Sequence, residues 1–177
     1  ALVLAPGVAT MSSALLGALE AHKGLSLIGP RSNSKTAEFA IPVPLPPNLP
    51  GLSATVMRVE SLPPDVPVEL GQGGALRHWR EKLETRAEVV EKTCDGWPAL
   101  IRAGGLHYLA GWADEVALGR ILERLCREAG LDTEHLPEGL RRRDSATHRF
   151  HFNYNSFALE WQGREIPAAG VDWQPLG

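Results

Sequence analysis

The stretch Leu25-Ser26-Leu27-Ile28, which runs directly into Gly29-Pro30-Arg31-Ser32-Asn33-Ser34-Lys35-Thr36, decides the fold class. A short apolar run bounded by turn residues is typical of a buried strand. A similar run lies upstream at Leu2–Ala5, followed by a turn at Pro6-Gly7. Between the two runs, an N-cap at Ser12 or Ser13 and a stop at Gly24 enclose a helix with the apolar face Leu15, Leu16 and Leu19. This order predicts a strand-helix-strand unit with parallel strands and a right-handed connection.

The segment after this unit is predicted to be rich in strands. Five prolines between 42 and 50 exclude a helix or a central strand and predict an extended surface loop. Residues 53–59 are typical of a strand, and the ambiguous stretch 76–93 is assigned to strands. The turn at Asp95-Gly96 and the short apolar runs 99–101 and 106–110 extend these strands into an antiparallel meander.

The last third of the chain changes character. Asp114 is a suitable N-cap for an amphipathic helix that Gly130 ends. From about residue 137 the composition predicts a small β unit with strands near 140–143, 147–154, 157–161 and 170–173. We therefore predict an α/β domain at 1–136 and a small antiparallel β domain at 137–177. Because the first residues are already apolar, we also expect sheet neighbours of the first strand to lie upstream.

Composition and charge limit the class of protein. The chain has 177 residues, 44% hydrophobic and 22% charged, which predicts an ordered domain. Its net charge of -3 gives no global attraction to nucleic acid or to an anionic membrane. Neither Cys94 nor Cys126 lies in a metal or disulfide spacing, and no apolar run approaches the roughly 20 residues of a membrane span. These features predict a cytoplasmic protein without a membrane partner.

The loop Gly29–Thr36 has one chemical interpretation that must be weighed. It differs from the phosphate-binding pattern G-x-x-x-x-G-K-[ST] only at Ser34, where the pattern requires glycine. Such a loop also needs a helix that begins at Lys35, and the prolines from Pro42 onward leave room for barely two turns. We therefore interpret the segment as an ordered surface loop in which Arg31 and Lys35 hold neighbouring backbone or carboxylates.

Other reactive residue types also have structural interpretations. Cys126 lies on the apolar face of a helix and Cys94 precedes a turn, so neither has the setting of a nucleophile. His148 and His151 should point to opposite faces of a strand, which argues against a shared metal. We predict no catalytic, metal-binding or cofactor-binding residue in the chain, and we interpret the acids Glu81, Glu84, Glu88 and Glu91 as part of a solvated, charge-balanced surface.

The tail leaves one alternative open. Arg141-Arg142-Arg143 followed by Phe150, Phe152 and Tyr154 would suit stacking on single-stranded nucleic acid. The simpler interpretation places the aromatic residues in the core of the small domain and the arginines on a solvated face or an interface.

The order of several segments resembles the glycoside hydrolase family 42 β-galactosidases. The resemblance spans nearly the whole chain and rests on residues 2–7, 29–36, 78–81, 95–100, 108–111 and 150–154. It implies most of a trimerisation domain with a class I glutamine-amidotransferase-like, flavodoxin-like three-layer α/β fold, followed by a small C-terminal β domain. Asn33 stands where the family leads us to expect glycine.

The resemblance also implies which functions to expect. In that family two glutamates on a (β/α)₈ barrel upstream of this region carry a retaining mechanism, and neither position occurs here. We therefore expect a non-catalytic, trimer-forming region of an enzyme that hydrolyses terminal β-D-galactosides, with galactoside bound only in the complete enzyme and with no cofactor. The alternative is an independent amidotransferase-like binding or enzymatic domain.

Overall fold

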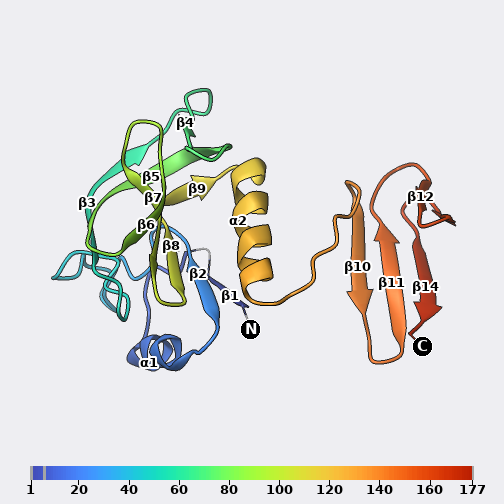
Figure 1. The fold of residues 1–177 in the computed structure, drawn as a ribbon, viewed down its shortest axis with the longest axis horizontal. Helices are drawn as coiled ribbons and strands as arrows, with labels where there is room; N and C mark the ends of the chain where they lie inside the picture. The colour runs from blue at the N-terminus through green and yellow to red at the C-terminus, as the bar shows by residue number, and fades with distance from the viewer. Residues whose placement is uncertain (1, 6, 177) are drawn as a thin grey trace. The chain divides into compact units, whose positions relative to one another are not determined.

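The computed structural model describes residues 2–5 and 7–176, so the predicted turn at Pro6-Gly7 lies partly outside the described residues. The chain divides into two compact units, Ala1–Asp132 and Thr133–Gly177 (Figure 1). Both units are built mainly from strands, and the described residues contain two α-helices.

A five-stranded mixed sheet organises the first unit. Its strand order is β1 (Leu2–Ala5), β2 (Leu25–Ile28), β8 (Leu106–Leu109), β7 (Pro98–Ala103) and β6 (Glu88–Lys92). The first three strands run parallel and the last three form an antiparallel meander. The predicted parallel pairing of the first two strands is confirmed.

The two helices pack on opposite faces of this sheet, as the alternation of its strands requires. Ile28 and Tyr108 share one hydrophobic cluster with residues of α1 (Ser13–Ala21), whereas Leu27 and Leu109 share another with α2 (Glu115–Glu128). Ser12 and Asp114 are the N-caps of the two helices, as predicted.

Two details of α1 differ from the prediction. The helix ends at Ala21, with His22 as its C-cap, so Gly24 lies beyond its end. Leu15 is 44% exposed, because Leu16 and Leu19 alone fit the stripe that faces the sheet.

A second sheet forms around the longest strand of the chain. β5 (Ala75–Thr85) pairs with β3 (Ala54–Ser61) and β4 (Val68–Glu69) along one edge and with β9 (Gly111–Ala113) along the other. The predicted meander from residue 76 onward is therefore wrong at its first step. Both edges of β5 are already occupied, so β6 pairs with β7 in the first sheet instead.

The second unit is a small antiparallel structure. Its three-stranded sheet has the order β10 (Leu140–Asp144), β11 (His148–Asn153) and β14 (Val171–Pro175), and β12 (Leu159–Trp161) forms a hairpin with β13 (Arg164–Ile166). The four strands that we predicted in this region are present with small shifts of their ends.

The prediction that Phe150, Phe152 and Tyr154 form the core of the small unit is wrong. The two phenylalanines are half-buried and Tyr154 is 73% exposed. The alternate residues His151 and Asn153 are buried instead. The Asn153 amide explains this choice of face, because its Nδ2 donates to the carbonyls of Ile166 and Pro167, which belong to the hairpin and its exit.

Candidate functional site

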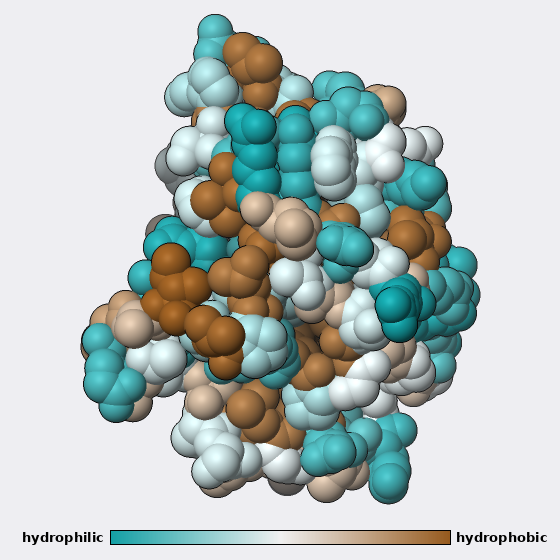
Figure 2. Space-filling model, turned by 90° about the vertical axis from the view of Figure 1, so that its left-hand side faces the viewer, coloured by the Kyte–Doolittle hydropathy of each residue, from teal (hydrophilic) through white to brown (hydrophobic). Residues whose placement is uncertain are grey.

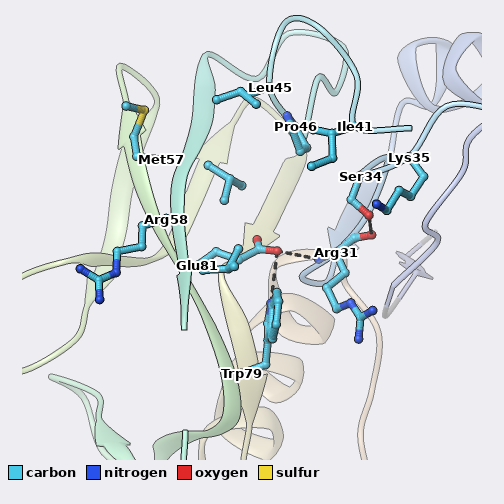
Figure 3. Close-up of a pocket in the computed structure, with 12 residues that line it drawn as sticks. Arg31, Ser34, Lys35, Ile41, Leu45, Pro46, Met57, Arg58, Trp79 and Glu81 are labelled. Atoms are coloured by element: carbon cyan, nitrogen blue, oxygen red, sulfur yellow. Dashed lines mark hydrogen bonds between the residues drawn. The ribbon is translucent and has the colours of Figure 1, made fainter. Parts of the chain in front are cut away.

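A surface hollow with a volume of about 580 Å³ lies on the first unit. Its wall comes from the loop that follows β2, the proline-rich segment, and strands β3 and β5 (Figure 3). The lining residues are Arg31, Ser34, Lys35, Ile41, Leu45, Pro46, Val56, Met57, Arg58, Val59, Trp79 and Glu81. The loop that first drew attention in the sequence therefore forms part of a surface hollow.

A buried carboxylate lies at the floor of the hollow. Glu81 is 4% exposed, and its Oε1 accepts hydrogen bonds from the backbone N–H of Arg31 at 2.8 Å and from Trp79 Nε1 at 3.4 Å. Its Oε2 accepts a hydrogen bond of 2.5 Å from the hydroxyl of Tyr108, which is fully buried. Burial, followed by the negative charge of Glu81, raises the pKa of the Tyr108 phenol well above its usual value. The phenol therefore stays protonated and acts as a donor.

Three cationic side chains line the hollow around this floor. The Arg31 guanidinium lies 5.2 Å from the centroid of the Trp79 ring, a cation–π distance. Arg58 forms an exposed ion pair with Glu60, in which Nε and Oε1 are 3.3 Å apart. Together with Lys35 they give the hollow a positive rim around one fully hydrogen-bonded carboxylate.

The loop Gly29–Thr36 is held by its own hydrogen bonds. The buried Ser32 hydroxyl donates to the carbonyl of Gly29 at 2.8 Å and accepts from the backbone N–H of Val8 at 3.3 Å. Asn33 has φ +48, in the left-handed region that favours glycine, and its Nδ2 donates to the carbonyl of Asn48. The departure from glycine at Asn33 is thus accommodated, since asparagine tolerates this conformation.

The loop has a structural role and lacks the geometry of a phosphate cradle. Residues 29–53 are described throughout and contain no helix, so no helix N-terminus faces the loop. Arg31 does hold a carboxylate, as the sequence suggested, but with its backbone N–H, while its guanidinium covers Trp79. The hydroxyl of Ser34 donates back to the carbonyl of Arg31.

Exposed apolar side chains surround the hollow. Four of its lining residues are exposed hydrophobic side chains: Ile41, Leu45, Met57 and Val59. Phe39 and Val43, which flank Ile41 in the sequence, are 74% and 95% exposed. Figure 2 shows hydrophobic residues gathered around a depression on this side of the molecule. We call these six residues and the hollow the apolar face. Contiguous apolar surface of this kind marks sites of interaction with other proteins or with ligands.

The apolar face does not have the arrangement of a glycosidase site. Retaining glycosidases place two carboxyl groups about 5 to 5.5 Å apart. Among the residues that line the hollow, Glu81 is the single acid, and three donors already hold its two oxygens. The geometry therefore suits binding of a surface, with Glu81 fixing the loop from below.

Of the four glutamates interpreted as solvated surface, Glu84 and Glu88 are exposed as predicted, whereas the interpretation is wrong for the other two. Glu81 and Glu91 are both 4% exposed. The Glu91 carboxylate accepts from Arg120 Nη2 of α2 at 2.9 and 3.1 Å and from the backbone N–H of Gln72. Local charge alternation resembled a solvated surface, but the partners Tyr108 and Arg120 lie far away in sequence. The sequence signal that could have indicated the Glu81–Tyr108 pair was the phenol of Tyr108 within the apolar run 106–110.

The remaining candidate residues are dispersed. Cys94 is exposed beside a turn, and Cys126 is partly buried on α2. His148 lies on the aromatic side of β11, 5.1 Å from the Trp173 ring centroid, whereas His151 is buried on the other side. Within residues 2–5 and 7–176, no group of three or more His, Cys, Asp or Glu side chains could hold a metal ion. Neither described helix is both long and apolar enough to span a bilayer.

Comparisons with known proteins find similarity to β-galactosidases. The β-galactosidase of Thermus thermophilus is 40% identical over 166 residues, which cover 90% of this chain and 26% of the relative. Over this region, the chain is similar to β-galactosidases, and its structural neighbours include a family 42 member. The crystal structure of the β-galactosidase from the psychrophile Marinomonas ef1 superposes with a TM-score of 0.88 and 32% identity, covering 97% of this chain and 28% of that one.

The fold is shared more widely among β-galactosidases than the sequence. A family 42 β-galactosidase from G. stearothermophilus matches with a TM-score of 0.76 at 14% identity, covering 97% of this chain and 31% of that one, which shows likeness of fold alone. No protein-family model matches the chain. The chain spans about a quarter of the length of the Thermus β-galactosidase that it resembles.

Proposed function

We propose that this polypeptide is a non-catalytic assembly region of a retaining β-galactosidase that hydrolyses terminal β-D-galactosides. In the complete cytoplasmic enzyme it would join three subunits and surround the active site with protein. The active site itself would lie on a catalytic barrel outside this region, and galactoside would bind there. The observation that carries the proposal is the apolar face, whose exposed hydrophobic residues surround a hollow that holds a single, fully hydrogen-bonded carboxylate.

Two further expectations belong to this proposal. Residues 1–136 would be the trimerisation domain, a partial glutamine-amidotransferase-like fold with three layers, and residues 137–177 the C-terminal β domain. The helices on opposite faces of the five-stranded sheet support the layered arrangement. The second, antiparallel sheet around β5 is an addition that the simple three-layer description does not include.

Oligomeric mass tests the assembly role. We expect the 177-residue chain to elute from size exclusion with a light-scattering mass about three times its 19.2 kDa. Ile41→Asp should lower this mass because it places a carboxylate on the apolar face, at a residue that lines the hollow. Val66→Asp is the matched control, since Val66 is also exposed but does not line the hollow. A monomeric chain at high concentration, or equal behaviour of the two variants, would contradict the proposal.

Hydrolysis tests the non-catalytic role independently. A chromogenic β-galactoside should remain intact with the purified chain, because the hollow lacks the two facing carboxyl groups that retaining hydrolysis uses. Turnover that persists through purification and disappears with Glu81→Gln would refute the proposal, since it would make Glu81 a catalytic carboxylate.

A further inference from the structure

The small unit, Thr133–Gly177, carries a second interaction surface. In its three-stranded sheet, Arg141 lies opposite Phe152, which lies opposite Val171, and Arg143 lies opposite Phe150, which lies opposite Trp173. Residues directly opposite each other in antiparallel strands share one face of the sheet. These six residues and His148 therefore form a single surface, which we call the aromatic face.

The aromatic face is open to solvent. Trp173 is 55% exposed, Val171 is also exposed, and the two phenylalanines are half-buried. The phenylalanine rings stack with centroids 6.2 Å apart, and His148 meets the edge of Trp173 at 5.1 Å. Next to these rings the three arginines of β10, Phe152 and Tyr154 line a hollow of about 570 Å³. The rings thus form an ordered platform without a cover within the unit.

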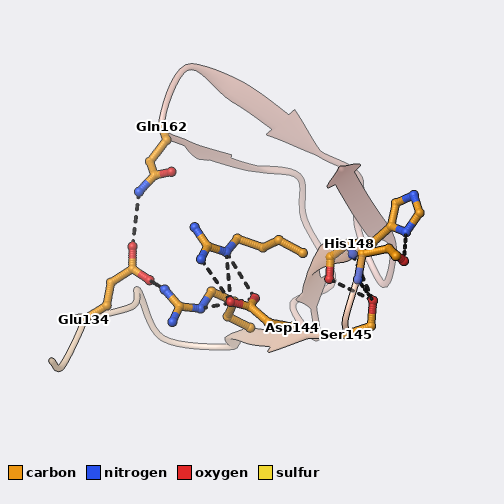
Figure 4. Close-up of polar contacts among 8 residues, drawn as sticks. Glu134, Asp144, Ser145, His148 and Gln162 are labelled. Carbon is orange, nitrogen blue, oxygen red and sulfur yellow. Dashed lines mark hydrogen bonds and ion pairs between the residues drawn. The ribbon is translucent and has the colours of Figure 1, made fainter. Parts of the chain in front are cut away.

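The opposite face of the sheet, which we call the covered face, buries His151 and Asn153 and carries an ion-pair network at its other end. Its residues Asp144 and Arg149 form a bidentate ion pair, and Arg142 pairs with Glu134 and Asp144 (Figure 4). Asp172 pairs with Arg164 of the hairpin. Both acids of the three strands, Asp144 and Asp172, therefore lie on this face, whereas the open face carries cationic, aromatic and apolar side chains.

The unit buries little apolar surface of its own. Its buried hydrophobic residues within 133–176 are Leu140 and Ile166, and the remaining buried side chains, His151 and Asn153, are polar. A domain of this size rarely gains enough from such a core to fold stably by itself. Four large apolar side chains, Phe150, Phe152, Val171 and Trp173, lie instead on the aromatic face, where burial requires a partner.

We infer that the aromatic face docks onto an apolar protein surface rimmed by carboxylates, which belongs to the part of the β-galactosidase polypeptide outside this chain. A second copy of the same face does not fit, because Arg141 and Arg143 would meet guanidinium groups. Planar guanidinium groups beside aromatic rings instead suit carboxylates, which they bind in a bidentate manner. The Thermus relative is almost four times as long as the matched region, so its remaining polypeptide is the source of this surface. The inference rests on the proposed function.

A stability comparison on the 177-residue chain is the first test. Trp173→Ser should leave hydrogen exchange of β10, β11 and β14 unchanged, because an uncovered side chain contributes little to the isolated unit. Asn153→Ala is the matched control on the covered face, and it should speed exchange in all three strands by removing the contacts to Phe157, Ile166 and Pro167. Equal acceleration by both variants would overturn the inference, since the aromatic face would then be part of the unit's own core.

The second test uses a complete enzyme. The 166 aligned residues of the Thermus thermophilus β-galactosidase are replaced by their counterparts from this chain, and hydroxyl-radical oxidation is compared between the chimaera and the isolated chain. We expect Trp173 and Phe150 to be oxidised at least several-fold more slowly in the chimaera, and Trp173→Ser to speed exchange there but not in the isolated chain. Equal oxidation in an active chimaera would refute docking.

Two additions to these tests separate the alternatives. Protection of Trp173 in the isolated chain by a single-stranded oligonucleotide at low salt would replace the protein partner by nucleic acid and overturn the inference. The oligomeric mass of the Trp173→Ser variant separates the docking proposal from the proposed assembly role. If Trp173→Ser keeps the mass of a trimer but the three strands lose their protection from hydrogen exchange in the chimaera, the effect belongs to the aromatic face alone. If the parent chain is monomeric while Trp173 is protected from oxidation in the chimaera, only the assembly role is contradicted.

Discussion

Replacing Tyr108 by phenylalanine removes one oxygen atom from the floor of the hollow and leaves the buried ring in place. In the parent chain this hydroxyl donates to Glu81 Oε2 at 2.5 Å, and both residues are buried. A hydrogen bond to a charged group contributes about 1.5 to 3 kcal/mol, and its removal here leaves a carboxylate oxygen without this donor. We expect Tyr108→Phe to lower the free energy of unfolding by about 2 kcal/mol at pH 8.

The same substitution has a defined pH signature. Burial and the Glu81 charge raise the Tyr108 pKa above its ordinary value of 10.0, so the unfolded chain loses the phenolic proton first as the pH rises. The stability from the protonated phenol is complete below that ordinary value and is lost above it. The loss is about 1.4 kcal/mol per pH unit for one proton. The advantage of the parent chain over Tyr108→Phe should therefore shrink by about 1.4 kcal/mol one unit above the ordinary pKa.

Urea unfolding of the parent and of Tyr108→Phe, followed by far-ultraviolet circular dichroism across this pH range, measures both quantities. Tyr154→Phe is the matched control, because Tyr154 is 73% exposed and should behave as the parent chain does. A difference below about 0.5 kcal/mol at pH 8 would show that the bond contributes no more than a surface contact. A difference that stays constant at alkaline pH would refute the assigned role of the phenolic proton.

Four further substitutions test other parts of the fold by the same unfolding assay. Gly74→Ala should lower the free energy of unfolding by about 2 to 4 kcal/mol, because φ is +76 and the added Cβ would lie 2.5 Å from a backbone nitrogen of α2. Gly119→Ala, in contrast, should raise it by about 0.5 to 1 kcal/mol, because nothing lies within 4 Å of the added Cβ. Arg80→Met should lower the free energy of unfolding by about 2 kcal/mol at pH 7, because it removes the hydrogen bond from Arg80 to Glu60. The loss should be smaller at pH 3. Lys82 and Arg80 lower the pKa of Glu60, and the stabilisation that this lowered pKa represents is lost as the carboxyl is protonated. His107→Leu should gain stability relative to the parent as the pH falls below 6.5, by at most about 1.4 kcal/mol per unit, because burial lowers the pKa of this imidazole and its Nε2 has no hydrogen-bond partner within the described residues.

Elements fixed by local sequence were predictable. Asp114 caps α2 with its side chain on the N–H of Ala117, and the apolar stripe of that helix continues to Leu125. The parallel pairing of β1 and β2 followed from two apolar runs separated by one helix. In each case residues within a few turns of one another carry the necessary information.

Features fixed by distant contacts were not predictable from local patterns. Glu81 and Glu91 stand among alternating charges, and that pattern alone predicts solvent exposure. Their burial depends on Tyr108 and Arg120, 27 and 29 residues further along the chain. Glu81 is buried also because it lies in the middle of β5, a strand that is paired along both edges and is therefore less accessible to solvent.

The small unit shows why alternation identifies the two faces of a strand but not which one is covered. Phe150 and Phe152 share one face and His151 and Asn153 share the other, as a period of two requires. Hydrophobicity alone assigns the phenylalanines to the core. The hairpin β12–β13 reverses this assignment, because the Asn153 amide satisfies carbonyls that would otherwise be buried without donors. A strand that buries its polar residues and exposes its aromatic ones has the pattern of an interface, so the failed prediction of a core is itself the observation that points to a partner.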